Sequence, residues 1–87
     1  MKLTFDHVCS ILRSKRKCEV RHGWFDDPMI LTPTVRKDKD GKNACIVILD
    51  NGVGGIAYSE YDRFSTLADG TITIKSDEDG PCSIKLL

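Results

Sequence analysis

The chain has 87 residues, of which 40% are hydrophobic and 30% are charged. These values are typical of a globular protein and exclude a disordered chain, and the length leaves room for a single domain, residues 1–87. Thirteen Lys and Arg balance thirteen Asp and Glu, so bulk charge argues against general nucleic-acid binding.

The charge is unevenly distributed along the chain. Residues 1–43 hold ten basic and six acidic side chains, whereas residues 44–87 hold three and seven. Opposite charge in the two halves would let two copies attract each other, and a small core gains from association. We therefore expect a homo-oligomer.

The first segment of the chain predicts a helix. Thr4 is a good cap, and apolar residues follow at helical spacing over about three turns. The residues on this face are Phe5, Val8, Cys9, Ile11 and Leu12. The polar stretch from Ser14 to Lys17 predicts an exposed turn.

Two strands are expected next. Cys18 to Trp24 alternates, with Cys18, Val20 and His22 on one side. After a turn at residues 26–28, Met29 to Lys37 predicts a second strand. Pro33 would give this strand an edge position or a bulge, because proline has no N–H for the ladder. Residues 38–43 predict a hairpin loop.

The run Ala44–Leu49 is apolar at every position. It predicts a central strand buried on both faces, with the helix on one side. Asn51-Gly52 predicts a hairpin turn. The returning strand, Val53 to Tyr58, contains Gly54-Gly55, which predicts a bulge or a close backbone approach.

The last third predicts a short helix and a hairpin. Ser59 to Asp62 can cap a helix with Tyr61, Phe64 and Leu67 or Ala68 facing inward. Thr71–Lys75 and Cys82–Leu87 predict strands joined by residues 76–81. The predicted fold class is therefore α+β: a mainly antiparallel, twisted sheet of about six strands, with one N-terminal helix packed on it and one short second helix.

No secretion signal or membrane span is predicted. Residues 1–7 lack the apolar stretch of a leader, and no segment approaches 18 apolar residues. We expect a cytoplasmic protein without membrane contact. The four cysteines, with no C-x-x-C pair, are then free thiols; two disulfides in a secreted protein are the alternative.

Metal sites and catalytic centres are not predicted. Cys18 and His22 are four residues apart, but in a strand this spacing spans roughly 13 Å, too far for one zinc ion. Asp38-x-Asp40-Gly41 lacks the later ligands of a calcium loop. No nucleophile elbow or phosphate loop is present. We expect a protein that is not an enzyme and has no metal or other cofactor.

The densest basic cluster lies beside the single tryptophan. Arg13, Lys15, Arg16, Lys17 and Arg21 precede Trp24. An aromatic ring beside positive charge can seat an anion or a nucleotide, with Trp24 stacking and Arg21, His22, Lys17 or Arg16 contacting phosphate. The alternative is a solvated helix end followed by a tryptophan that anchors the core.

The same residues carry a family resemblance. Phe5, the helix with Leu12, the lysine-rich turn and Val20–Trp24 resemble the opening of the small phage proteins that sequester signalling nucleotides to defeat Thoeris immunity. Here the arginine directly follows the valine, which departs from the family's V-x-R-x-G-W-like segment. Residues 68–72 are similar to a later segment, but the family's closing acidic-tryptophan segment is missing. The resemblance covers about a third of the chain.

The resemblance implies a non-enzymatic oligomer that binds a cyclic nucleotide between subunits, in the host cytoplasm if the chain is phage-encoded. It carries over Trp24 and Arg21. Two functions stay open: sequestration of a small anionic ligand such as a signalling nucleotide, and inhibition of a host defence protein, for example a nuclease or CRISPR effector, through a charged face. A concave site containing Trp24 would favour the first, and a flat or convex charged face the second.

Overall fold

Two antiparallel sheets and one helix form the fold in the computed structural model, which describes residues 2–37, 44–50, 52 and 54–87. The elements are β1 (Lys2–Leu3), α1 (Phe5–Leu12), β2 (Cys18–His22), β3 (Met29–Leu31), β4 (Thr34–Lys37), β5 (Ala44–Asp50), β6 (Gly55–Tyr58), β7 (Arg63–Thr66), β8 (Ile72–Lys75) and β9 (Cys82–Leu86). The predicted α+β class is confirmed.

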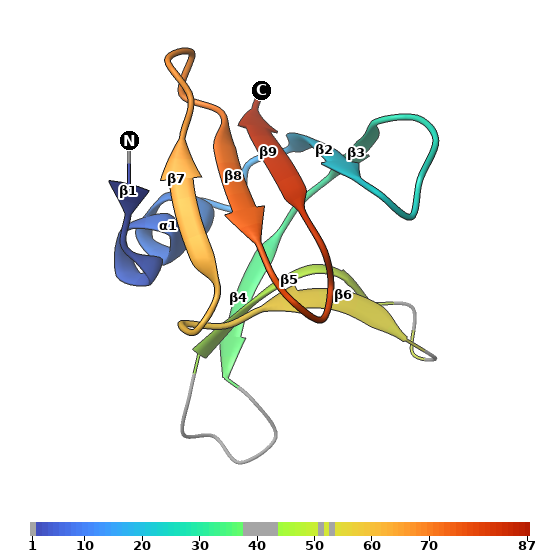
Figure 1. Cartoon of the computed structure of the whole chain (residues 1–87), viewed down its shortest axis with the longest axis horizontal. Coiled ribbons are helices and arrows are strands. Elements are labelled where there is room, and N and C mark those ends of the chain that lie inside the picture. The colour runs from blue at the N-terminus through green and yellow to red at the C-terminus, as the bar shows by residue number, and fades with distance from the viewer. Residues whose placement is uncertain (1, 38–43, 51, 53) are drawn as a thin grey trace.

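The strands divide between a larger and a smaller sheet. The six-stranded sheet has the order β1-β7-β8-β9-β2-β3, and the three-stranded sheet has the order β4-β5-β6. In Figure 1 the smaller sheet lies below the larger one, and β5 and β6 cross behind the loop that joins β8 to β9. The predicted antiparallel sheet of about six strands matches the larger sheet in strand number, whereas the separate three-stranded sheet was not predicted.

The helix begins where the sequence predicts. The Thr4 hydroxyl accepts a hydrogen bond from the His7 N–H at 3.2 Å, which caps α1. The helix ends at Leu12 after eight residues, shorter than the predicted three turns, and Lys15 has a positive φ of 55°. The basic residues therefore lie beyond the helix. No helix in the described residues is long and apolar enough to cross a bilayer.

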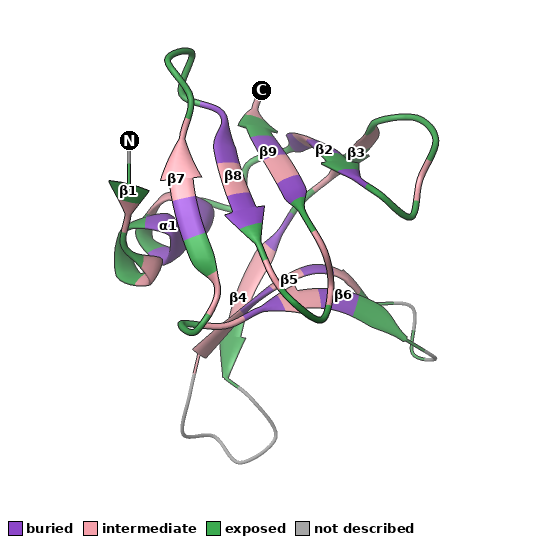
Figure 2. Cartoon of the chain, viewed as in Figure 1, coloured by how far each residue is buried: buried purple, intermediate pink, exposed green. Residues whose placement is uncertain are grey.

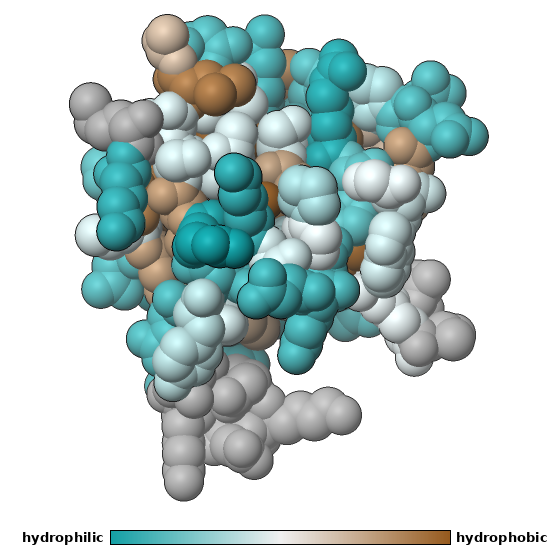
Figure 3. All heavy atoms as spheres, viewed as in Figure 1, coloured by the Kyte–Doolittle hydropathy of each residue, from teal (hydrophilic) through white to brown (hydrophobic). Residues whose placement is uncertain are grey.

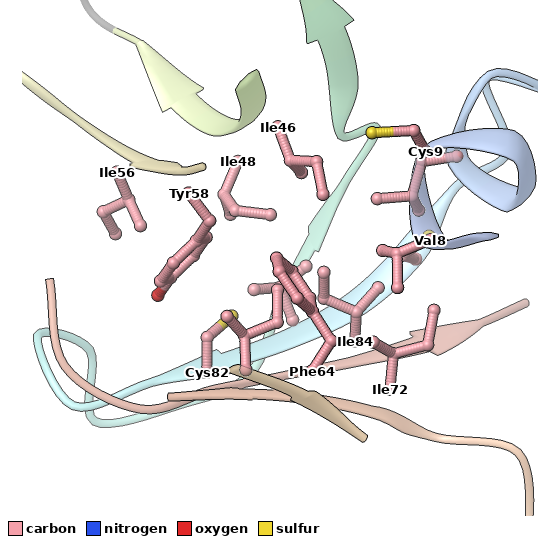
Figure 4. Packing of buried hydrophobic residues seen from close by; sticks show 14 residues of the cluster. Val8, Cys9, Ile46, Ile48, Ile56, Tyr58, Phe64, Ile72, Cys82 and Ile84 are labelled. Carbon is pink, nitrogen blue, oxygen red and sulfur yellow. The ribbon is translucent and has the colours of Figure 1, made fainter. Parts of the chain in front are cut away.

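The core lies between the two sheets, with α1 closing one side beside β4 and β7. Figure 4 shows Ile46, Ile48 and Tyr58 of the smaller sheet pointing toward Phe64 and Ile84 of the larger sheet. Buried and less buried residues alternate along β8 and β9 (Figure 2). The larger sheet therefore packs one of its faces against the core. Its other face is directed to solvent.

The segment Met29–Lys37 is not one strand. It forms β3 at the edge of the larger sheet and β4 at the edge of the smaller sheet. Pro33 is fully buried between them. Proline cannot donate to a ladder, so the chain leaves one sheet here and joins the other.

The central position predicted for Ala44–Leu49 is confirmed, because β5 pairs with both β4 and β6. Burial on both faces is wrong. Ile46 and Ile48 are buried, but Val47 and Leu49 are half-buried. The helix and the larger sheet both pack on the Ile46 face, and no described element covers the other.

The predicted second helix is also wrong. Ser59 and Asp62 do form a capped turn, in which the Asp62 carboxylate accepts from the Ser59 N–H at 2.8 Å. The chain then enters β7, which pairs with β1 and β8. Pairing on both edges overrides the local helix signal. Phe64 is buried as expected, whereas Tyr61, Leu67 and Ala68 are exposed.

The remaining turn predictions have different outcomes. The hairpin of β8 and β9 is confirmed. Residues 38–43, with the predicted loop and the calcium alternative, lie outside the described residues, as do Asn51 and Val53. Gly52 has the positive φ, 83°, that the Asn-Gly prediction requires.

Replacement of Gly55 by alanine is expected to destabilise the fold by about 1–3 kcal/mol. A Cβ at Gly55 would lie 2.2 Å from the Leu49 carbonyl oxygen, beside the irregular register of β5 and β6. Backbone must move to relieve this contact. The matched control is Gly54→Ala, where a Cβ meets nothing within 4 Å. Urea unfolding of both variants measures the difference, and equal midpoints would contradict it.

Candidate functional site

The residues of the predicted basic cluster lie at opposite ends of β2. Arg16 and Lys17 precede the strand, and His22 ends it. Five residue steps along a strand separate Lys17 from His22 by roughly 16 Å. Arg16 donates a hydrogen bond to the Leu87 carbonyl at 2.5 Å, and the Leu87 N–H donates to the Lys17 carbonyl at 3.1 Å. This basic end of the cluster therefore holds the last residue of the chain.

His22 has a structural position. Its side chain is on the core side of β2 and is buried. Nδ1 accepts from the Trp24 N–H at 3.1 Å, which places the ring proton on Nε2, and Nε2 donates to the Asp79 carbonyl. With both nitrogens engaged, His22 joins the β2–β3 turn to the β8–β9 loop and has no ring nitrogen free for a phosphate.

Trp24 is not a core residue. Its side chain is 62% exposed, and its ring meets the His22 ring edge-on at 5.2 Å between centroids. The interpretation of Trp24 as a core anchor is therefore wrong. An exposed indole at a turn is a surface feature of the molecule.

Two substitutions at this turn are expected to lower the free energy of unfolding by different amounts. Trp24→Ala is expected to change the free energy of unfolding by less than about 1 kcal/mol, because most of the ring is already in water. His22→Phe is expected to cost about 1–3 kcal/mol, because it leaves the Trp24 N–H and the Asp79 carbonyl without their partner. Thermal unfolding of both variants tests this. A larger loss for Trp24→Ala would refute the assignment of the two roles.

Arg21 lies on the outer face of the six-stranded sheet, away from His22. The strand register places a row of polar residues across this face: Lys2 opposite Ser65, Ser65 opposite Thr73, Thr73 opposite Ser83, and Ser83 opposite Arg21. Neighbouring rows pair Arg63 with Lys75, and Lys85 with Glu19. We call this surface, from Lys2 on β1 to Arg21 on β2, the basic face.

Cations dominate the strand residues of the basic face. The five cations are Lys2, Arg21, Arg63, Lys75 and Lys85, and the one strand carboxylate is Glu19. In the space-filling view, strongly hydrophilic residues lie among pale residues of intermediate hydropathy on this side of the molecule (Figure 3). The face is therefore suited to anions.

The ion pairs on the basic face are long and exposed. Arg21 lies 3.5 Å from Glu19, and Arg63 lies 3.8 Å from Asp77. Such exposed pairs contribute little to stability, so a ligand can replace them at low cost. Lys75 forms no ion pair with another described residue.

Two shallow hollows share Arg21 and Ser83 on this face. The first, about 400 Å³, is lined by Arg21, His22, Gly23, Thr73, Ile74, Lys75, Pro81, Cys82 and Ser83; we call it the cationic hollow. Of the predicted site residues it therefore brings Arg21 and His22 together. The second, about 280 Å³, is lined by Glu19, Arg21, Leu67, Asp69, Thr71, Ser83 and Lys85; we call it the mixed hollow. Trp24 lies outside the described lining of both.

A third hollow, about 540 Å³, continues the cationic surface toward β1. Lys2, Arg63 and Lys75 line it together with Glu60 and Asp62. The carboxylates there offset the cations. The cationic hollow, in contrast, has no acidic side chain in its described lining.

The buried thiols are poor nucleophiles. All four cysteines are free. Burial raises the pKa of Cys82 to about 11, and burial also raises the pKa values of Cys9 and Cys18. These thiols stay protonated near neutral pH, whereas the reactive form is the thiolate. Within the described part of the chain, no group of three or more His, Cys, Asp and Glu is placed to hold a metal ion.

The comparisons with protein-family models, curated proteins and solved structures found no match. The resemblance to the Thoeris anti-defence family stays a prediction.

Proposed function

We propose that this chain is a non-enzymatic binding protein that takes a small anionic ligand on its basic face. The observation that carries the proposal is the cationic hollow, where Arg21 and Lys75 border a surface without carboxylates. A guanidinium and an ammonium group supply charge-assisted hydrogen bonds to phosphate oxygens. Protonated buried thiols and a fully bonded His22 argue against a nucleophile–base pair.

The resemblance to the Thoeris anti-defence proteins adds a ligand class to this proposal, a signalling nucleotide. It also adds a biological role, phage antagonism of host immunity, and an oligomeric state. Of the two residues that the resemblance carries over, Arg21 lines the cationic hollow. Trp24 is exposed at the β2–β3 turn, where a second subunit can reach it.

The alternative function, inhibition of a host defence protein, is favoured by two observations. Trp24 lines neither hollow that contains Arg21, so the described part of the chain does not show the concave Trp24 site expected of a sequestering protein. The cations of the basic face extend over β1, β7, β8, β9 and β2, a wider surface than one small ligand needs. Such a surface fits an acidic face of a partner protein.

The proposal is tested by native mass spectrometry and calorimetric titration. Native mass spectrometry of the purified protein reports any retained small molecule and whether the mass is a multiple of 9.7 kDa. Titration with ADP and with pyrophosphate should give binding that weakens as salt rises from low to physiological, because exposed charges are screened. Absence of binding by both probes at low salt would overturn the proposal and leave the protein-inhibitor alternative.

A further inference from the structure

We infer that the basic face binds a nucleoside phosphate in one orientation, with the phosphates in the cationic hollow and the ribose hydroxyls in the mixed hollow. The inference rests on the proposed function, since it assigns a ligand class and two specificity residues to the same face. Its starting point is that the two hollows share Arg21 and Ser83. One ligand that crosses this shared boundary therefore occupies both hollows.

The two hollows differ in chemistry. The cationic hollow offers donors from Arg21 and Lys75. The mixed hollow adds two carboxylates, Glu19 and Asp69, beside the Lys85 ammonium group. A bare polyphosphate would be repelled by these carboxylates, whereas a ligand with hydroxyl or amino donors at one end would be held by them.

The carboxylates have oxygens to offer. Asp69 Oδ1 accepts from the Thr71 N–H at 2.9 Å, and the Thr71 side chain also hydrogen-bonds the carboxylate, which as an acceptor group can take a further bond from a ligand. This backbone hydrogen bond lowers the pKa of Asp69, so the carboxylate stays ionised at neutral pH. Glu19 meets Arg21 through Oε1 in a pair that is 3.5 Å long. In dinucleotide-binding sites a carboxylate commonly accepts a hydrogen bond from a ribose hydroxyl.

The spacing along the strands fits an extended ligand. Lys75 and Thr73 lie two residues apart on β8, and Ser83 opposite Thr73 lies two residues from Lys85 on β9. Lys85 in turn is opposite Glu19. Two steps of two residues span roughly 13 Å, which matches the reach of a nucleoside diphosphate from its terminal phosphate to its sugar or base.

The hollows leave little area for stacking of a base. Leu67, which is 55% exposed, is the large apolar side chain of the mixed hollow. It can cover one side of a sugar or base. Discrimination is therefore expected to come from the ribose hydroxyls rather than from an aromatic stack.

The test compares three probes, ADP, 2′,3′-dideoxy-ADP and pyrophosphate, on the full chain by calorimetric titration. ADP is expected to bind about five- to tenfold more tightly than the other two, because only ADP donates ribose hydrogen bonds to the carboxylates. Glu19→Gln gives the decisive measurement. It removes a carboxylate that attracts hydroxyl donors but repels phosphate, so ADP binding should weaken about fivefold while pyrophosphate binding strengthens or stays unchanged.

Asp69→Asn repeats the test without loss of the turn, because the amide oxygen can still accept from the Thr71 N–H. Asp69→Asn should likewise weaken the binding of ADP and leave the binding of pyrophosphate unchanged or stronger. Melting temperatures of both variants confirm that they are folded. If ADP and pyrophosphate bind equally and Glu19→Gln strengthens both, the orientation is wrong although the anion-binding proposal stands. If neither probe binds the unmodified chain, the proposed function itself fails.

Discussion

Replacement of Ile46 by alanine is expected to destabilise the fold by about 2–5 kcal/mol. Ile46 lies at the centre of β5, is fully buried, and points from the smaller sheet into the shared core (Figure 4). Truncation removes three carbons from a site where two sheets meet, so the cavity can collapse only in part. The free energy of unfolding of native proteins is about 5–15 kcal/mol, so this one substitution removes a large share of the stability. Urea unfolding measures the loss.

The control for Ile46 is its neighbour Val47. Val47 faces the half-buried side of β5, opposite Thr34 on β4 and Ala57 on β6. Val47→Ala should cost about 1 kcal/mol or less, since the side chain is already partly in water. Similar losses at both positions would mean that the second face of β5 is covered in solution, as a partner subunit would cover it.

Strand segments with simple alternation were predictable from the sequence. Cys18, Val20 and His22 point to one side of β2, and Glu19 and Arg21 to the other, as the pattern requires. The Thr4 cap and the β8–β9 hairpin follow from equally local signals. In each case the local preference and the tertiary environment favour the same structure.

The wrong predictions have a common cause, which is that a partner distant in the sequence decides the structure. Ser59–Asp62 carries a helix signal and forms a capped turn, but Phe64 pairs with Leu3 on one side and Ile74 on the other. Likewise, the sequence pattern of Met29–Lys37 does not indicate that its first part pairs in one sheet and its last part in the other. The apolar run of β5 predicts burial but not how many layers cover it.

The candidate site was the least predictable part. The densest local cluster, Arg13 to Arg21, is divided by β2, so that Arg16 holds Leu87 while Arg21 joins the basic face. Lys75 comes to Arg21 through the β8–β9–β2 pairing, although 54 positions separate them in the sequence. Alternate positions on β8 and β9 are polar, which predicts a solvated face. Only strand order and register reveal that its cations meet.

The double charge reversal Arg21→Glu with Lys75→Glu is expected to weaken ADP binding at least about 100-fold. Each cation supplies a charge-assisted hydrogen bond of about 1.5–3 kcal/mol, and the introduced carboxylates repel the same phosphate. Both side chains are exposed, so the variant should keep its melting temperature to within a few degrees. Calorimetric titration and thermal unfolding of one preparation separate binding from folding.

Arg36→Glu is a control for this reversal that changes the net charge half as much, because it reverses one cation instead of two. Arg36 is exposed on β4 of the smaller sheet and forms a 3.3 Å pair with Asp50, so its loss changes the net charge without touching the basic face. If net charge acts only at long range, ADP binding should weaken in both variants, and both losses should disappear as the salt concentration rises. Local contact predicts a large loss only for the Arg21 and Lys75 reversal, retained at physiological salt. If Arg36→Glu weakens ADP binding as strongly as the double reversal does, the cationic hollow is not the binding site.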